Sequence, residues 1–403
     1  MTDRDALLER LEAGEIRLHE LEDHTNPETA AAVRREAIES ATETDLEAIG
    51  SHTFAASEAD ANVENLVGAV QIPLGVAGPV PIAGSAAEGS YHLPLATTEG
   101  ALVASVNRGL SILRTAGGVN ARVTATGMTR APVFRVPDVT GAETVLEWVE
   151  ANYDRLRAEA EATTNHGELQ SIDPYVVGDG VYLRFVFDTK DAMGMNMVTI
   201  ATRAACDLIE AETPGSLVAL SGNLCSDKKP AAINAIEGRG RSVTADARIP
   251  ATLVEDRLHT TPQAIAEANT RKNLIGSAKA GSLGFNAHAA NVIAAAFLAT
   301  GQDAAQVVEG SNAITTASVR DGDLYASVSL PSLEVGTVGG GTSLPTQAEG
   351  LDIVGVRGGG SPPGSNADAL AEVIAAGVLA GELSLLAAMA SRHLASAHED
   401  LGR

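Results

Sequence analysis

Lysine and aromatic residues are scarce in this 403-residue chain, and the basic residues are outnumbered by acidic ones. Lys and Arg total 28 against 52 Asp and Glu, which gives a formal net charge of −24. Such a chain cannot easily assemble the basic face that binds a nucleic-acid backbone, so this class of partner is excluded. An acidic surface with little lysine instead fits a protein kept soluble in a very salty cytosol. We therefore expect folding and activity to depend on salt.

Disulfides, a leader and a membrane span also lack support in the sequence. Two cysteines, Cys206 and Cys225, provide neither a disulfide framework nor a metal-binding spacing, which suits a reducing interior. The longest apolar stretches are 291–300, which is too short to span a bilayer, and 369–394, which charged residues interrupt. Residues 1–24 form a charged amphipathic pattern rather than a signal peptide. We expect a soluble, cytoplasmic protein without a metal site.

The periodicity of apolar residues predicts an α+β fold in three parts. Residues 1–63 are expected to form a small helical N-terminal segment. Within 131–220, strands and helices alternate in the order βαββαβ, which is typical of a ferredoxin-like domain. Residues 64–130 and 221–403 are expected to form one large helical and mixed domain, into which the ferredoxin-like domain is inserted.

Individual elements follow from the same patterns. Asn26 is expected to cap a helix that has Pro27 at its first position. In the inserted domain we expect one helix over 142–163 and a second over 195–212. Further helices are expected over 262–274, 286–301 and 366–398.

The segment 221–242 (SGNLCSDKKPAAINAIEGRGRS) is the most informative part of the chain. It sets Asp227, Lys228 and Lys229 side by side in a loop of small residues. Only five lysines occur in the whole chain, so two adjacent lysines are hard to explain as an ordinary solvated loop, the usual meaning of a charge pair. The triplet is suited to bind a negatively charged ligand.

Other segments carry chemistry only in combination. Thr97 to Gly100 precedes an apolar helix and places Glu99 near its N-terminus, where a carboxylate is usually just a cap. In one order along residues 60–398, several segments resemble the catalytic portion of 3-hydroxy-3-methylglutaryl-CoA (HMG-CoA) reductases of the biosynthetic class. These segments are ENLVGAVQIPLGVAGP, TTEGALVAS, MTRAP, DAMGMNM, SGNLCSDKKPAAINAIEGRGRS, NAHAANVIAAAFLATGQDAAQ, SLEVGTVGGGT and HLASAH. The membrane-spanning segment of animal and plant members is absent, as in archaeal members.

The resemblance implies an NADPH-dependent reduction of HMG-CoA to mevalonate and free coenzyme A, and assigns roles by position. Catalytic roles fall on Glu99, Lys228, Asp303 and His398. Substrate contacts fall on Arg130, Ser221, Asp227, Lys229, Lys272 and Asn291. Cofactor contacts fall on Asp191, Met195, Asn196, Gly339, Gly340 and Gly341. The segment Glu64–Gly68 matches a dimerisation motif, which implies a homodimer or dimer of dimers with active sites at the subunit interface.

The chemistry of these residue types agrees with the implied reaction. Each hydride addition develops an oxyanion, which the Lys228 ammonium can stabilise while Asp303 holds it charged and in place. Glu99 near Asp303 would act as the acid, because a second carboxylate raises its pKa and the two titrate as a coupled pair. His398 can protonate the departing thiolate. His393, one turn earlier, is the alternative for that role.

The cofactor site departs from the commoner nicotinamide pattern. Because no G-x-G-x-x-G follows a strand, a Rossmann fold is not supported, and the helix that begins in DAMGMNM is expected to meet the cofactor through its N-terminus. Some family members bind the 2′-phosphate with a Ser-Arg pair, and Ala151 and Asn152 occupy those positions here. Arg155 or Arg403 could substitute for that pair, so NADPH is the expected cofactor.

Two other functions fit part of the pattern. One is the degradative oxidation of mevalonate with NAD, which the DKKPAAIN context and the C-terminal helix disfavour. The other is a catalytically silent homologue that binds coenzyme A esters. Retention of Glu99, Lys228, Asp303 and His398 argues against this second alternative.

Overall fold

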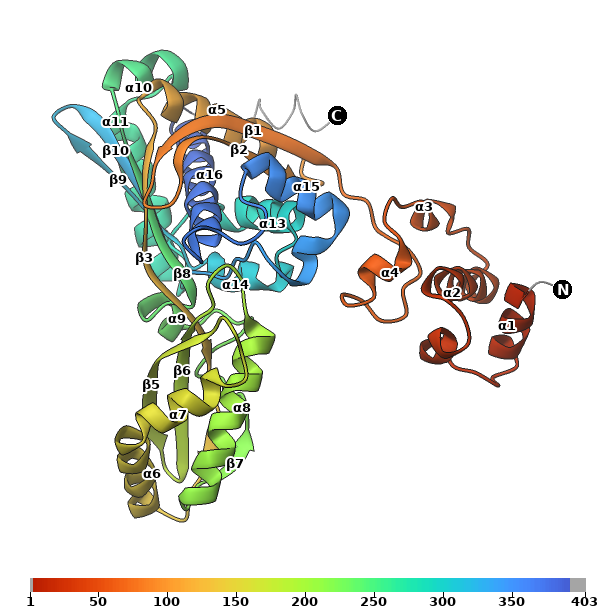
Figure 1. The fold of residues 1–403 in the computed structure, drawn as a ribbon. Coiled ribbons are helices and arrows are strands. Elements are labelled where there is room, and N and C mark those ends of the chain that lie inside the picture. Colours follow the sequence, from red (N-terminus) through yellow and green to blue (C-terminus); the bar gives the residue numbers. More distant parts are fainter. Residues whose placement is uncertain (1–2, 392–403) are drawn as a thin grey trace.

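The computed structural model describes residues 3–391, and both helices and strands build it, so the predicted α+β class is confirmed (Figure 1). His393, His398 and Arg403 lie outside the described residues. The buried apolar side chains of the described part gather in three clusters. The smallest lies in the N-terminal helices, one lies within residues 128–209, and the largest lies in the remainder.

The N-terminal region is a group of short helices connected to the rest by an extended segment (Figure 1). As predicted, Asn26 caps the helix that starts at Pro27, because its side-chain oxygen accepts the Thr29 N–H at 2.9 Å. The elements are α1 (Asp3–Glu12), the 3-10 helix η1 (Leu18–Asp23), α2 (Pro27–Thr42), α3 (Glu47–Gly50) and α4 (Ala56–Ala59).

One sheet runs through the other two regions, and β3 (Val119–Arg130) connects its two parts. Residues 120–127 of β3 pair antiparallel with β8 (Gly240–Ile249), and its last three residues pair with β6 (Gly180–Asp188). The strand order is β7-β4-β6-β3-β8-β10-β9, with β1, β2 and β5 paired off this path. The remaining strands are β1 (Leu74–Ala83), β2 (Glu88–Ala96), β4 (Val133–Arg135), β5 (Glu168–Val177), β7 (Ser216–Ala219), β9 (Ile314–Arg320) and β10 (Asp323–Leu333).

The region from β4 to β7 has its own sheet order and core. Its strands lie in the order β7-β4-β6-β5 with antiparallel neighbours, and its helices are α6 (Val139–Ala151), α7 (Tyr153–Glu161) and α8 (Met195–Glu212). The prediction of a single helix over 142–163 is wrong. The helix is interrupted at Asn152, whose φ of −112° and ψ of 18° leave the helical range and end α6 before α7 begins.

The largest cluster surrounds the long helix α16 (Ser365–Ala390), which packs against α5 (Leu102–Thr115), α13 (Ala289–Thr300) and β8 (Figure 1). A Cβ at Gly109 of α5 would lie 2.1 Å from the Ala380 carbonyl oxygen, so glycine allows the two helices to approach closely. In the described part of the chain, α16 is long and apolar enough to cross a membrane, but 78% of that stretch is buried inside the protein. It is therefore placed as a core helix.

Two carboxylates inside this apolar helix are satisfied by backbone donors. Glu372 accepts N–H bonds from the turn at residues 85–87, and Glu382 accepts those of Ala287 and His288 at 2.7 and 2.8 Å. Because buried charges need such partners, both carboxylates fasten surrounding turns to α16.

The helix expected over 262–274 continues further than predicted. It runs as α11 (Pro262–Ala268), the π-helix η2 (Asn269–Gly276) and α12 (Ser277–Ala280). The other elements are α9 (Ala232–Ile236), α10 (Ala251–Leu258), the 3-10 helix η3 (Ala304–Gln306), α14 (Val307–Gly310), the 3-10 helix η4 (Gly340–Ser343) and α15 (Pro345–Val354).

Candidate active site

The lysine-bearing loop between β7 and α9 has an unusual backbone. Asn223, Ser226 and Lys228 have φ values of 64°, 47° and 60°. Side-chain-bearing residues rarely adopt this left-handed conformation, and when they do the surrounding structure must hold them there. The loop is thus set by contacts outside itself, as is common where a protein positions functional groups.

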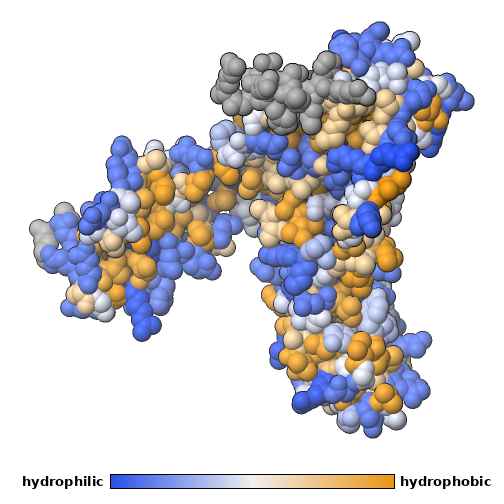
Figure 2. All heavy atoms as spheres, turned by 180° about the vertical axis from the view of Figure 1, so that it is seen from behind, coloured by the Kyte–Doolittle hydropathy of each residue, from blue (hydrophilic) through white to orange (hydrophobic). Residues whose placement is uncertain are grey.

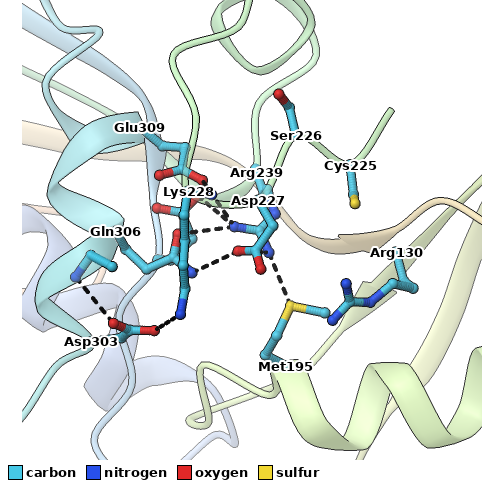
Figure 3. A network of polar contacts seen from close by, with 12 residues as sticks. Arg130, Met195, Cys225, Ser226, Asp227, Lys228, Arg239, Asp303, Gln306 and Glu309 are labelled. Carbon is cyan, nitrogen blue, oxygen red and sulfur yellow. Dashed lines mark hydrogen bonds and ion pairs between the residues drawn. The ribbon is translucent and has the colours of Figure 1, made fainter. Parts of the chain in front are cut away.

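Lys228 and Asp303 face each other across this loop (Figure 3). Lys228 Nζ lies 2.9 Å from Asp303 Oδ2, so the contact predicted from the sequence is present. Asp303 also caps η3 by accepting the Ala305 N–H at 3.1 Å, which fixes its direction. The hydrogen bond to Asp303 raises the pKa of the Lys228 ammonium against the effect of burial. Both side chains remain partly exposed, at 46% and 31%, so a ligand can reach them.

Behind the loop, the buried guanidinium of Arg239 contacts several polar side chains. Arg239, whose side chain is 0% exposed, lies 3.0 Å from Asp227 Oδ1 and donates to Gln306 Oε1 at 3.0 Å. It also contacts the carboxylates of Glu309 and Glu334 at 3.4 and 3.2 Å. Burial raises the pKa of Asp227, but Arg239 and the hydrogen bond from Gln306 outweigh it, and the net pKa is lowered. Asp227 therefore stays ionised.

Two fully buried carboxylates share this cation. Burial raises the pKa of Glu334 to about 8, against the opposing attraction of Arg239. Burial also raises the pKa of Glu309, which the Lys228 N–H and Arg239 oppose. The backbone N–H of Lys228 donates to Glu309 Oε1 (Figure 3). The cluster thus reaches from the core to the backbone of the lysine loop.

Sequence reasoning identified Asp227 of this cluster as a site residue but missed the other four members. They are Gln306, Glu309, Glu334 and Arg239. A signal was present, because Asp303, Gln306 and Glu309 recur every three residues, a spacing that places side chains on one face of a tight helical turn. Nothing in the neighbouring sequence GRGRS, by contrast, indicates that Arg239 is buried.

Glu99 lies in the turn after β2, three residues before α5 begins at Leu102. It is exposed, and its backbone N–H donates to Thr97 Oγ1 at 3.0 Å. Within residues 3–391, no hydrogen bond or ion pair joins Glu99 to Asp303. The coupled titration of these two carboxylates therefore stays a prediction.

Arg130, Ser221 and Lys229 lie near the loop, each with a partner inside the chain. Arg130, at the end of β3, donates to Thr199 Oγ1 at 2.8 and 3.1 Å. Ser221 Oγ lies 3.4 Å from Cys225 Sγ, and Lys229 Nζ donates to the Asp227 carbonyl at 3.0 Å. Figure 3 places Arg130 beside Met195 and close to the loop.

Lys272 and Asn291 come from two other elements. Lys272 lies on the π-helix η2, and Asn291 lies in the first turn of α13. π-Helical turns are rare and occur frequently at functional sites. Both side chains are partly buried.

The two segments assigned to the cofactor lie side by side although they are far apart in the sequence. Ala192 and Val338 form a parallel bridge, and the Thr337 N–H donates to the Asp191 carbonyl at 2.7 Å. A Cβ at Gly336 would lie 2.5 Å from the Met193 nitrogen, so glycine is needed for this approach. Gly339, Gly340 and Gly341 follow directly.

The start of α8 suits an anionic group. Its N-cap is Gly194, which has no side chain to satisfy the first backbone N–H groups at Met195 and Asn196. These N–H groups and the positive end of the helix dipole favour a phosphate. The α8 N-terminus and the adjacent glycines therefore fit a dinucleotide pyrophosphate.

Two expected cofactor contacts are engaged within the chain. Both carboxylate oxygens of Asp191, which is 5% exposed, accept backbone N–H bonds from the segment that starts α16. Arg155, expected as a substitute for the 2′-phosphate ligand, is paired with Glu212 at 2.7 Å and with Asn152 at 2.9 Å. Arg155 is exposed, so a phosphate would have to compete with Glu212 for it.

Comparison with known proteins agrees with the family resemblance found in the sequence. A family model described as hydroxymethylglutaryl-coenzyme A reductase matches residues 30–403. The chain is 68% identical to a 3-hydroxy-3-methylglutaryl-coenzyme A reductase of Haloferax volcanii over 403 residues, with 100% of each covered. It is 54% identical to the protein of that name from Methanothermobacter thermautotrophicus over 400 residues, covering 99% of this chain and 100% of the relative.

The fold is also shared with a solved structure. A class II 3-hydroxy-3-methylglutaryl-CoA reductase from Streptococcus pneumoniae, bound to NADPH in open conformations, matches with a TM-score of 0.68 and 21% identity. The match covers 93% of this chain and 100% of that chain.

Proposed function

The chain belongs to the hydroxymethylglutaryl-coenzyme A reductase family, and we propose that it reduces HMG-CoA to mevalonate and free coenzyme A with two NADPH. The observation that carries this proposal is the ion pair between Lys228 and Asp303 on a strained loop. It gives a fixed, charged ammonium that a substrate can reach. The relatives at 68% and 54% identity carry the reductase name over the full length of this chain, which favours reduction over mevalonate degradation.

Lys228 stabilises the oxyanion that each reduction develops on the substrate carbonyl. When bound, NADPH supplies the hydride for each of the two reductions. Asp303 keeps the Lys228 ammonium charged and aimed at the carbonyl oxygen. A fixed donor aimed at developing charge is worth about 3–4 kcal/mol of transition-state stabilisation.

Proton transfer falls to two other residues. After the first hydride addition, Glu99 delivers a proton to the carbonyl oxygen, which gives a hemithioacetal. As the hemithioacetal collapses to an aldehyde, its hydroxyl returns that proton to Glu99, the C–S bond breaks, and His398 protonates the departing coenzyme A sulfur. The second hydride and a second proton then convert the aldehyde to the alcohol of mevalonate. Arg130, Ser221, Asp227, Lys229, Lys272 and Asn291 hold the glutarate part of the substrate.

NADPH binds where the start of α8 meets the glycine segment. The uncapped first turn at Met195 and Asn196 holds the pyrophosphate, and Gly339 to Gly341 allow the cofactor backbone to approach closely. Asp191 shapes this site indirectly by fixing the loop to α16. Residues 131–220 form the cofactor domain, and 64–130 with 221–403 form the substrate domain.

Self-association through Glu64–Gly68 completes the proposal. In this segment Glu64 and Asn65 are exposed and the other three residues are partly buried. The neighbouring side chains of Val70, Leu74 and Val76 are 82%, 51% and 46% exposed. Apolar side chains at such exposure mark a surface that a second copy can cover. The assembly is a homodimer or a dimer of dimers in the cytoplasm.

The experiment is an NADPH oxidation assay at high salt with HMG-CoA, followed by identification of the products. We expect two NADPH oxidised per HMG-CoA, with mevalonate and free coenzyme A released, and no turnover in Asp303→Asn. Oxidation of mevalonate with NAD⁺ and coenzyme A as the faster reaction would favour the degradative alternative. Binding of HMG-CoA without turnover would instead make the chain a silent homologue.

A further inference from the structure

The segment that follows α13 contacts the lysine loop at three points. Asp303 binds the side chain of Lys228 at 2.9 Å, and Glu309 accepts its backbone N–H. Between them, Gln306 Nε2 donates to Asp227 Oδ1 at 3.0 Å. The three contacts come from side chains spaced every third residue on one face of η3 and α14, so one short element sets both the backbone and the side chain of Lys228 (Figure 3).

The conformation of Lys228 requires such a contact. Its φ of 60° lies in the left-handed region, where a residue with a side chain is uncommon and needs outside support. The Glu309 side chain provides that support, because its Oε1 atom accepts the Lys228 backbone N–H.

Glu309 itself is held by the core. Its side chain is 0% exposed, and its Oε1 atom also lies 3.4 Å from Arg239 Nη1, the same nitrogen that contacts Glu334 Oε1 at 3.2 Å. The other oxygen, Oε2, has no hydrogen-bond partner among the described residues. Arg239 and the Lys228 backbone N–H therefore both contact Oε1 of Glu309. This arrangement fixes the position of the atom that accepts the Lys228 N–H.

We propose that Glu309 is a positioning residue, which holds Lys228 in the left-handed backbone conformation that brings its ammonium onto Asp303. The inference rests on the function proposed above for Lys228. Charged groups face both partners. The Lys228 ammonium is influenced by Asp303, Asp227 and Arg239, and Glu309 is influenced by Arg239, Asp227 and Glu334.

The scarcity of lysine allows a direct test that needs no catalysis. With only five lysines in the chain, protein labelled with ¹³C at the lysine ε-carbon gives few signals, which Lys→Arg variants assign. The pH titration of each signal reports the pKa of that ammonium. Lys190, paired with Asp188 at 2.7 Å, serves as a reference within the same spectrum.

We compare Glu309→Ala, Glu309→Gln and Asp303→Asn with the parent. In Asp303→Asn the pKa of Lys228 falls because its partner is neutral. Glu309→Ala gives the same fall without touching that partner, and kcat drops roughly 10–100-fold with a smaller change in KM, as expected for a misplaced group. Glu309→Gln keeps an oxygen acceptor for the Lys228 N–H and leaves the pKa near the parent value. Glu349→Ala, an exposed control on α15, changes nothing.

Two results would overturn the positioning role. One is an unchanged pKa of Lys228 in folded Glu309→Ala, and the other is a fall in Glu309→Gln as large as that in Asp303→Asn. The second result tests the inference even where Glu309→Ala does not fold. If the titrations follow expectation while the parent shows no HMG-CoA reduction, the proposed function fails and the positioning role stands.

Discussion

The carboxylate of Asp191 accepts the backbone N–H of Gly364, the N-cap residue of α16, at 2.7 Å. It also accepts the N–H groups of Gly360, Asn366 and Ala367 at 2.9–3.1 Å. A negative charge at the N-terminus of a long helix is favoured by the helix dipole. The loop before α8, which we propose as part of the cofactor site, is therefore fastened to the central helix of the largest cluster.

Asp191→Ala should lower the free energy of unfolding by about 2–4 kcal/mol. The expected loss exceeds the ~1 kcal/mol of an ordinary cap because four backbone donors lose their acceptor together. Urea unfolding at constant high salt measures it. The control is Asp138→Ala, which removes one exposed cap bond, to Gly141 on α6, and should cost about 1 kcal/mol or less. Equal losses in the two variants would contradict a fastening role for Asp191.

Glu334 should make stability fall as pH rises from weakly acidic to weakly alkaline. Burial raises its pKa from 4.5 to about 8, with Arg239 lowering it and Glu309 raising it further. The folded state then binds more protons than the unfolded state in this interval. The contribution of Glu334 is thus fully present below pH 4.5 and is lost as pH rises through about 8.

Glu334→Gln should remove this decline, because the amide stays neutral in both states. Unfolding free energies of parent and variant, measured across the same interval, test the expectation, and Glu349→Gln on the surface of α15 is the control. A decline that persists unchanged in Glu334→Gln would assign it to other groups.

The sequence predicted the residues of the lysine loop better than the buried residues that hold this loop in place. The contact between Lys228 and Asp303 could be expected because both residues lie in segments that resemble those of the family, in which these positions are catalytic. The order of strands and helices in 131–220 followed from the periodicity of apolar residues. The break at Asn152 was missed because the apolar pattern continues across it. Arg239 and Glu334 were missed because a buried charge is recognised only by partners that lie far away in sequence.

Lys228→Ala should abolish both reductions, since each needs the same oxyanion stabilisation, worth roughly 3–4 kcal/mol per lost donor.

His398→Gln should slow reduction of HMG-CoA far more than reduction of mevaldehyde, because the aldehyde has no thiolate to protonate. Rates of NADPH oxidation with each substrate separate the two roles. Equal losses on both substrates in His398→Gln would remove it from the leaving-group step, and His393→Gln is the matched control.

Activity should require molar KCl or NaCl, because 52 acidic residues face only 28 basic ones. The Debye length grows from about 3 Å at 1 M salt to about 30 Å at 0.01 M, so carboxylates then repel one another across whole faces. The proposed self-association through Glu64–Gly68 brings two such surfaces together and should weaken first.

As salt is removed, we therefore expect NADPH oxidation and sedimentation as an oligomer to decline before the helical circular dichroism signal does. Salt replacement by an uncharged osmolyte of equal osmolality separates screening from general solvent effects, since only an electrolyte shortens the Debye length. Full activity and an unchanged oligomer in dilute buffer would show that the acidic surface serves a purpose other than tolerance of high salt.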